Sequence, residues 1–324
     1  MEVFQIIIGI LIILITFLDF FHTTFSGRGF GFLSGALNRL LNNMILQNRS
    51  RSIFNFSGLT HLLITSFVWM ALLYWGTFII FTAGDEMVIN STTHLPATTV
   101  QRFYFTCYLL STLGIGDFIP GNQTSQVLAG ILSFTGFVLI TTGLTYLLSV
   151  VQAVLGKKEL SFLLSTMGCD VEQIYKFYKQ EDDLSGFVSD AENLRQLILK
   201  NASSYLAFPM VNYFLSKERD SALIVQLAAL HEVLEVLKMD WAPNTIEHTK
   251  INVVINAIEQ YLKLGLESPE DAPDKLDSLT TLRSFWRKYG YVYKRYSDMD
   301  RRLTASLRYA GWNWKEVYRL KEQQ

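Results

Sequence analysis

Three long apolar segments dominate the first half of the chain, and they run from Val3 to Phe25, from Leu59 to Ala83 and from Phe118 to Gly156. Each exceeds the roughly 20 residues that a helix needs to cross a bilayer. The third is longer than one membrane thickness, so we expect its beginning to be a loop and its end to continue as a helix beyond the lipid. The first could be a signal peptide, but it lacks a basic start and a small-residue cleavage site, so we predict a retained span.

A short aromatic-rich segment, 98–111, lies between the second and third apolar segments and is too short to cross a membrane. It leads directly into Thr112-Leu113-Gly114-Ile115-Gly116-Asp117, after which Pro120 stops any continuation and returns the chain toward the surface. Irregular backbone at membrane depth is tolerated only where it is buried in protein or lines a water-filled path. The order span, half-helix, glycine strand, span therefore predicts a pore loop.

The alternating glycines of this loop have a physical use. Gly114 and Gly116 can adopt the left-handed backbone angles that turn successive carbonyl groups to one side of the chain. The hydroxyl of Thr112 would add a further layer of oxygen atoms at the inner end. A row of such oxygens can replace the water shell of a bare cation.

Residues 111–118 with their flanking spans, roughly 59–155, resemble the pore module of tetrameric potassium channels, here prokaryotic-type with an extra N-terminal span. The threonine, both glycines and the aspartate stand in the family's places. The resemblance implies a homotetramer whose carbonyls hold potassium ions. It assigns the ion-binding filter to Thr112, Leu113, Gly114, Ile115 and Gly116, with potassium at the first four, and filter support to Ser111, Asp117 and Tyr108. The family most often has tyrosine or phenylalanine where this chain has Ile115, which favours a softer filter and weaker selectivity for potassium over sodium.

The third apolar segment offers a candidate gate. Gly136 lies about where such channels place a bending glycine, although glycines in membrane helices also serve close helix packing. Below it, Ile140, Leu144 and Leu148 recur at helical spacing and could form an apolar ring that gates by dewetting. The same three side chains could equally face lipid.

Topology follows from the filter, because its loops must face outward if the narrow end is extracellular. The predicted outer loops, 83–100 and 117–124, carry acidic residues, and the predicted inner segments carry basic ones: Arg28, Arg39, Arg49, Arg51, Lys157 and Lys158. This agrees with the positive-inside rule. We therefore expect a multi-pass protein of the cell (plasma) membrane with its N-terminus outside and its C-terminal domain cytoplasmic.

Between the first two spans, apolar residues repeat at helical spacing opposite Asn38, Arg39 and Asn42, which predicts a helix along the membrane surface. A linker packed on the cytoplasmic half is the alternative. Asp19 and His22, near the inner end of the first span, could sense protons or voltage. We favour the simpler interpretation that they cap a helix and contact a neighbouring span.

Charge and composition separate the two halves. The chain of 324 residues is 50% hydrophobic and carries a net charge of -1, and only five of its 28 basic and five of its 29 acidic residues lie in 1–156. The second half shows helical periods and no strand alternation, which argues against a dinucleotide-binding regulatory domain. The predicted helices are Val171 to Gln180, Val188 to Lys200, Ser221 to Lys238, Asn244 to Leu264 and Leu276 to Tyr296, with Asp170 and Ser189 as N-caps.

The predicted fold is thus an all-α membrane protein with four parts. Residues 1–25 form an N-terminal transmembrane helix, 26–58 a cytoplasmic linker with an interfacial helix, 59–156 the pore module, and 157–324 an all-α helical cytoplasmic domain.

The sequence contains no convincing enzyme motif. His231-Glu232-Val233-Leu234-Glu235 lacks the second histidine of a zinc-protease helix, and we interpret it as a solvated edge.

The leading hypothesis is a passive, potassium-selective cation channel that its helical cytoplasmic domain assembles or gates. The alternatives are a weakly selective monovalent-cation channel and a non-conducting membrane sensor with a relic filter. We expect the lipid bilayer and identical chains as partners, no nucleic acid, and no cofactor besides potassium ions in the filter. The sequence identifies no regulatory ligand.

Overall fold

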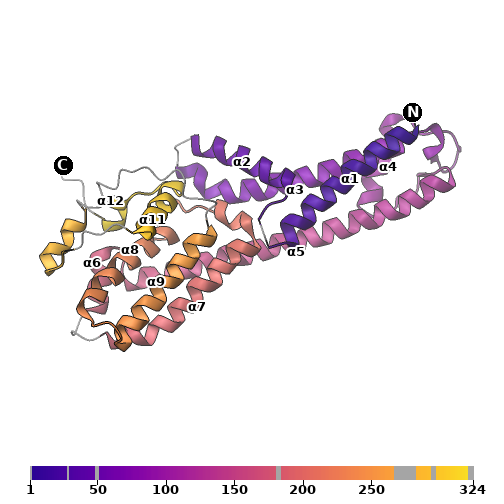
Figure 1. Ribbon diagram of the computed structural model, residues 1–324. Helices are drawn as coiled ribbons and strands as arrows, with labels where there is room; N and C mark the ends of the chain where they lie inside the picture. The colour runs from indigo at the N-terminus through magenta and orange to yellow at the C-terminus, as the bar shows by residue number, and fades with distance from the viewer. Residues whose placement is uncertain are drawn as a thin grey trace. The chain divides into compact units, whose positions relative to one another are not determined.

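The computed structural model describes residues 2–27, 29–47, 51–179, 184–265, 282–292 and 297–319. The chain divides into two compact units, one formed by Met1–Met44 with Leu59–Val150 and the other by Ile45–Gly58 with Val151–Gln324. We refer to them as the membrane unit and the helical unit and describe each separately (Figure 1). Helices make up nearly all of the regular structure, and three of them are long and apolar enough to span a bilayer, which confirms the all-α membrane fold.

The predicted spans correspond to α1 (Glu2–Phe25), α3 (Arg51–Phe81) and α5 (Gln123–Met167). As expected, the third apolar segment begins outside a helix, and α5 continues past Gly156. The predicted half-helix is α4 (Thr99–Leu110). Three short elements were not predicted: η1 (Asp85–Met87), β1 (Val88–Asn90) and β2 (Phe118–Pro120). The two strands pair antiparallel, with Ile89 opposite Ile119, and so join the segment before α4 to the segment after the pore loop.

Two glycines set the approach of α1 to α3, which lie side by side in Figure 1. A Cβ atom on Gly9 would lie 2.5 Å from Ile80 and 2.6 Å from the carbonyl oxygen of Gly76, and one on Gly76 would lie 2.8 Å from Ile13. Small residues at such a crossing let two membrane helices pack backbone to backbone, where van der Waals contact drives association.

Asp19 caps a helix from outside that helix. Its carboxylate is buried in the membrane unit and accepts hydrogen bonds from the backbone N–H groups of Leu33 (2.7 Å) and Ser34 (3.2 Å), in the first turn of α2 (Phe32–Gln47). It also accepts one from the indole N–H of Trp69 in α3, at 2.8 Å. A Cβ on Gly31 would clash with it at 2.2 Å, so this turn requires glycine. The contacts agree with the capping interpretation, whereas His22 is exposed.

The predicted helix between the first two spans is present as α2, and one residue of its predicted polar side, Asn38, has an unexpected role. Asn38 is fully buried, and its amide bonds the Nδ1 atom of His61 at 2.7 Å and the hydroxyl of Thr65 at 3.1 Å. The apolar side chains of Leu40 and Met44 are instead 60% and 61% exposed. Asn38 thus fastens α2 to α3 through polar side chains, while Arg39 beside it is exposed and the apolar side chains of Leu40 and Met44 remain free to contact another surface.

Replacing Asp19 tests this arrangement. We expect Asp19→Ala to lower the free energy of unfolding by at least about 2 kcal/mol, because it removes a helix cap and leaves a buried indole N–H without an acceptor. His22→Ala, a change on the same helix at an exposed position, is the matched control. Thermal unfolding in detergent measures both, and equal stability of the two variants would contradict the capping role.

The helical unit is built around α8 (Leu223–Leu237), which is buried on nearly every side. Around it lie α6 (Val171–Tyr178), α7 (Ser185–Ala207), η2 (Pro209–Tyr213), η3 (Lys238–Asp240), α9 (Ile246–Gly265), η4 (Ser284–Tyr289), α11 (Asp298–Tyr309) and α12 (Trp314–Tyr318). The helices α7 and α9 run side by side (Figure 1).

The sequence predicted the first four helices of this unit with small shifts in their ends. Asp170 is the N-cap of α6 as predicted and accepts from the N–H of Gln173 at 2.9 Å. Ser189 is not a cap, because α7 begins at Ser185 and Ser189 lies inside it. The predicted helix 276–296 is wrong in its described part, because the short helix η4 ends at Tyr289 and Gly290 follows in the left-handed conformation. Residues 276–281 and 293–296, as well as Arg28 and Arg49, lie outside the described residues.

The interpretation of His231 and Glu232 as a solvated edge is wrong, since both side chains are buried. Glu232 is paired with Arg283 at 2.5 Å, and the same guanidinium pairs with Asp300 at 2.6 Å. All three side chains are at most 1% exposed. The carboxylates of Glu232 and Asp300 also lie near a nitrogen of His231, and the guanidinium of Arg283 is paired with both carboxylates.

This network predicts a strong dependence on Arg283. We expect Arg283→Met to destabilise the protein by about 3–5 kcal/mol, because the change leaves two carboxylates buried without a counter-charge. Arg195→Met is the matched control, since Arg195 pairs with Glu192 at the surface, and it should change stability little. Chemical denaturation followed by tryptophan fluorescence compares them, and a tolerated Arg283→Met would refute the network's role.

Candidate functional site

The half-helix α4 is fixed firmly at its start. Thr98 and Gln101 form a capping box, in which the backbone N–H of Thr98 donates to the Gln101 side chain at 2.8 Å and that of Gln101 to the Thr98 hydroxyl at 3.4 Å. The buried guanidinium of Arg102 donates to the carbonyl oxygens of Ala97 (2.9 Å), Phe81 (3.3 Å) and Asp85 (3.1 Å). Arg102 thereby ties the half-helix to the end of α3. Sequence reasoning missed this role, although Arg102 is the one basic residue between the second and third spans.

An aromatic cluster supports the loop that follows α4. The hydroxyl of Tyr108 donates to the carbonyl oxygen of Phe118, across the base of the loop. Rings of Tyr104 and Phe105 contact the Tyr108 ring edge-on, at centroid distances of 5.2 and 5.3 Å. Tyr108, predicted as filter support, therefore connects the two ends of the segment 111–118. On the other side of α4, the Tyr74 hydroxyl of α3 lies 2.7 Å from the sulfur of Cys107.

The sign of the φ angle alternates along the loop backbone. The φ angles of Thr112, Gly114 and Gly116 are +57°, +59° and +87°, whereas Leu113 and Ile115 have ordinary negative values. A chain that alternates between right- and left-handed residues gathers its N–H groups on one side and therefore its carbonyl groups on the other. The left-handed angles at both glycines confirm the sequence prediction. That at Thr112 was not predicted, and it costs about 1–2 kcal/mol in a residue with a Cβ atom.

Hydrogen bonds hold the start of the loop and leave its oxygens available. The N–H groups of Thr112 and Leu113 donate to the carbonyl oxygens of Leu109 (3.1 Å) and Tyr108 (3.0 Å). Within the described part of the chain, no group donates to the carbonyl oxygens of residues 112–116. These residues are all exposed on the single chain. The site therefore offers a row of unpaired carbonyl dipoles.

The flanking residues close the loop. The Asp117 carboxylate accepts from the N–H of Phe118 at 3.1 Å, and the Asp117 carbonyl accepts from the backbone N–H (3.0 Å) and hydroxyl (3.1 Å) of Ser91. The hydroxyl of Ser111 donates back to the Tyr108 carbonyl at 3.3 Å. Ser91 carried no sequence signal, because it reaches the loop only through the turn after β1.

The structure gives Gly136 a packing role. A Cβ atom there would lie 2.4 Å from the carbonyl oxygen and 3.0 Å from the Cα of Leu110, at the end of α4. This is the close packing that stood as the alternative to a hinge. Ile140, Leu144 and Leu148 are 40%, 59% and 58% exposed on the single chain, so all three are free to face a neighbouring surface.

Comparison with known proteins agrees with this geometry. Residues 62–153 match a family described as ion channel. The matched range contains α4, the loop and most of α3 and α5, so an ion-channel pore module is supported where the unpaired carbonyls lie.

One relative extends beyond this range. The chain is 24% identical over 273 residues to "Uncharacterized membrane protein YdjJ" of Bacillus subtilis (strain 168), and the match covers 79% of this chain and 76% of that protein. It supports a membrane protein with both halves present in the relative. No solved structure matches the chain.

The contact between Gly136 and Leu110 leads to a prediction on stability. Gly136→Ala should lower the stability by about 1–3 kcal/mol, the usual cost of overpacking, because a backbone carbonyl cannot move aside as a side chain can. Gly130→Ala is the matched control in the same helix, since a Cβ there meets nothing within 4 Å. Thermal unfolding in detergent should separate the two, and equal melting temperatures would contradict the close contact.

Proposed function

We propose that four copies of this chain form a passive, potassium-selective channel in the cell membrane, with one loop of residues 112–116 contributed by each copy. The observation that carries the proposal is the row of unpaired carbonyl oxygens on a backbone whose hand alternates at Thr112, Gly114 and Gly116. Such oxygens can take the place of the water around a potassium ion. Potassium ions at Thr112, Leu113, Gly114 and Ile115 would be the transported species, and no catalytic residue is required.

The exposure of the loop supports assembly. Leu113 and Ile115 are 68% and 49% exposed on one chain, and the backbone around them lacks hydrogen bonds to its carbonyls. Lipid cannot satisfy these groups, so at membrane depth they need either protein or a water-filled path around them. A ring of identical chains supplies both, with the loops facing a common axis. The number four follows from the resemblance to tetrameric potassium channels.

Selectivity depends on how rigidly the loop is held. Ile115 cannot offer the ring that most members of the resembled family place there, which motivates the alternative of a weakly selective monovalent-cation channel. The bond from the Tyr108 hydroxyl to the Phe118 carbonyl and the bonds from Ser91 to the Asp117 carbonyl support a firm loop all the same. We therefore place potassium selectivity first.

The remaining assignments complete the proposal. Ile140, Leu144 and Leu148 would face the axis below the filter and gate the path by dewetting. The charge distribution supports an outer N-terminus and a cytoplasmic C-terminal domain, which assembles or gates the pore. The proposed domain limits are 1–25, 26–58, 59–156 and 157–324. The proposal involves no nucleic acid and no cofactor beyond the conducted ion.

Flux through liposomes tests the function. Purified wild-type protein should carry potassium down its gradient and carry sodium at least tenfold more slowly. Gly114→Ala should reduce potassium flux by at least tenfold, because an added Cβ disfavours the left-handed angle on which the carbonyl row depends. Gly130→Ala makes the same chemical change in α5, at an open position without such an angle, and should conduct like the wild type.

Other outcomes have distinct meanings. Equal potassium and sodium fluxes would establish the weakly selective channel, and an unchanged flux in Gly114→Ala would refute the filter assignment. If folded wild-type protein carries neither ion at any voltage or pH examined, the proposal is overturned in favour of a non-conducting membrane sensor.

A further inference from the structure

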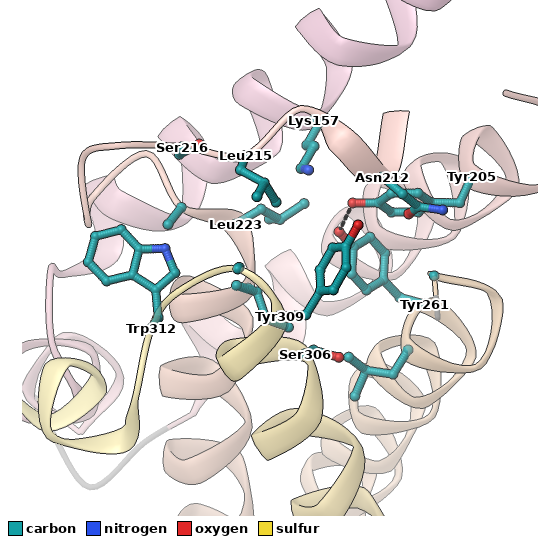
Figure 2. Close-up of a pocket in the computed structure, with 15 residues that line it drawn as sticks. Lys157, Tyr205, Asn212, Leu215, Ser216, Leu223, Tyr261, Ser306, Tyr309 and Trp312 are labelled. Carbon is teal, nitrogen blue, oxygen red and sulfur yellow. Dashed lines mark hydrogen bonds between the residues drawn. The ribbon is translucent and has the colours of Figure 1, made fainter. Parts of the chain in front are cut away.

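The helical unit contains a half-open pocket that the ion path does not use (Figure 2). It lies between the C-terminal part of α5, the segment after η2, and the ends of α9 and α11. The cavity measures about 60 Å³, which is room for roughly five water molecules at about 10–15 Å³ each. That space is smaller than a substituted benzene ring, so a ligand of that size would fill the cavity and extend through its open side.

The charge of the pocket is set by one residue. Lys157 is the one charged side chain among the residues that line it, and no carboxylate is among them. Its ammonium group donates to the carbonyl oxygen of Phe214 at 2.8 Å and lies 5.6 Å from the centre of the Tyr205 ring. A single hydrogen bond leaves two of the three ammonium protons for another acceptor. An unopposed ammonium beside a cavity favours an anionic ligand.

The walls are aromatic and carry hydroxyl groups. Rings of Tyr205, Tyr261, Tyr309 and Trp312 surround the space, and Figure 2 shows the tyrosine hydroxyls converging near Lys157. Tyr205 and Tyr261 share a hydrogen bond between their hydroxyls. Burial raises the pKa of Tyr261 well above its ordinary value, and that of Tyr309 as well, so these hydroxyls stay protonated and able to donate.

Ser306 adds an observation that points to a missing ligand. Its side chain lines the pocket and is 8% exposed, and its hydroxyl has no hydrogen-bond partner among the residues that the structure describes. A buried hydroxyl without a partner is unfavourable, because it has given up its hydrogen bonds to water. A bound group that accepts or donates at this position would remove the cost.

We propose that this pocket binds a small aromatic carboxylate, with the ring between the tyrosine and tryptophan side chains and the carboxylate on Lys157. Flat apolar walls with a few convergent polar groups are typical of small-molecule sites. Lys157 belongs to α5, the same continuous helix that carries Ile140, Leu144 and Leu148. An occupied pocket would therefore restrain the helix that holds the proposed gate. Only this last effect rests on the proposed channel function.

Binding is measured first, on the full-length protein in detergent and without reference to flux. Sodium benzoate is the probe, with benzyl alcohol and benzylamine as neutral and cationic analogues of similar size. We expect saturable benzoate binding by calorimetry, accompanied by quenching or enhancement of tryptophan fluorescence, and at least tenfold weaker binding of both analogues. A factor of about ten or more is what a charge-assisted hydrogen bond contributes.

Two variants locate the binding. Lys157→Gln should weaken benzoate binding at least tenfold, whereas Lys158→Gln removes the adjacent exposed lysine outside the pocket and should leave it unchanged. Ser306→Leu should fill the cavity and block all three probes. Melting temperatures verify that each variant folds, and if Lys157→Gln does not fold, Ser306→Leu and the analogue series decide the question.

The proposal is overturned if benzoate fails to bind, if benzyl alcohol binds equally well, or if Lys158→Gln weakens binding as much as Lys157→Gln. Potassium flux into liposomes then tests the regulatory effect: benzoate should change the flux of the wild type and leave that of Lys157→Gln unchanged. Benzoate binding without any ion flux would support the ligand site and contradict the channel function. Ion flux without benzoate binding would support the channel function and contradict the ligand site.

Discussion

The constraint on which the membrane unit depends is that backbone polar groups cannot be left in lipid without partners. Helices α1, α3 and α5 meet it internally, but residues 112–116 do not, since their carbonyls accept no hydrogen bond within the described chain. An ordinary turn does not need the alternating left-handed angles, which raise the free energy at Thr112 and place carbonyl dipoles of the same sign side by side. Both costs are offset if cations and a neighbouring chain face this row. The site is therefore incomplete on a single chain for the same reason that it suits an ion path.

Much of the surrounding structure serves to hold that strained segment in place. The capping box at Thr98, the three bonds of Arg102 and the Tyr108 hydroxyl fix α4 and both ends of the loop. The short β1–β2 pair brings Ser91 to the Asp117 carbonyl. These contacts are polar and mostly made to backbone, so they define position more sharply than apolar packing would. They also explain how a loop that lacks an aromatic residue at Ile115 can still be well supported.

The sequence predicted the spans, the half-helix and the glycine angles because each depends on local chemistry: apolar length, a capping pair, and tolerance of positive φ. It could not separate two uses of glycine. Gly114 and Gly116 are required by backbone angle, whereas Gly136 and Gly31 are required by neighbours at 2.4 Å and 2.2 Å. Nor could it show that Asn38 is buried, because its partners His61 and Thr65 lie more than 20 residues away in the chain. The burial of His231 and Glu232 was missed for the same reason: the partner of Glu232 is distant in sequence, since Arg283 lies 51 residues away.

The membrane unit and the helical unit solve the problem of buried polarity in different ways. In the membrane unit a carboxylate, Asp19, is satisfied by two backbone N–H groups and an indole, with no basic side chain among the bonds it makes to described residues. In the helical unit two carboxylates share the guanidinium of Arg283, so their partner is a full opposite charge rather than dipoles alone. Dipolar partners suit a site where a second buried charge would add its own desolvation cost, and an ion pair suits a core that must bring distant segments together.

The buried hydroxyl of Ser306 has neither kind of partner among the described residues. The pocket is lined both by this hydroxyl, which has no partner among the described residues, and by an ammonium without a carboxylate. This lining is consistent with a last partner that is a bound molecule rather than another part of the chain.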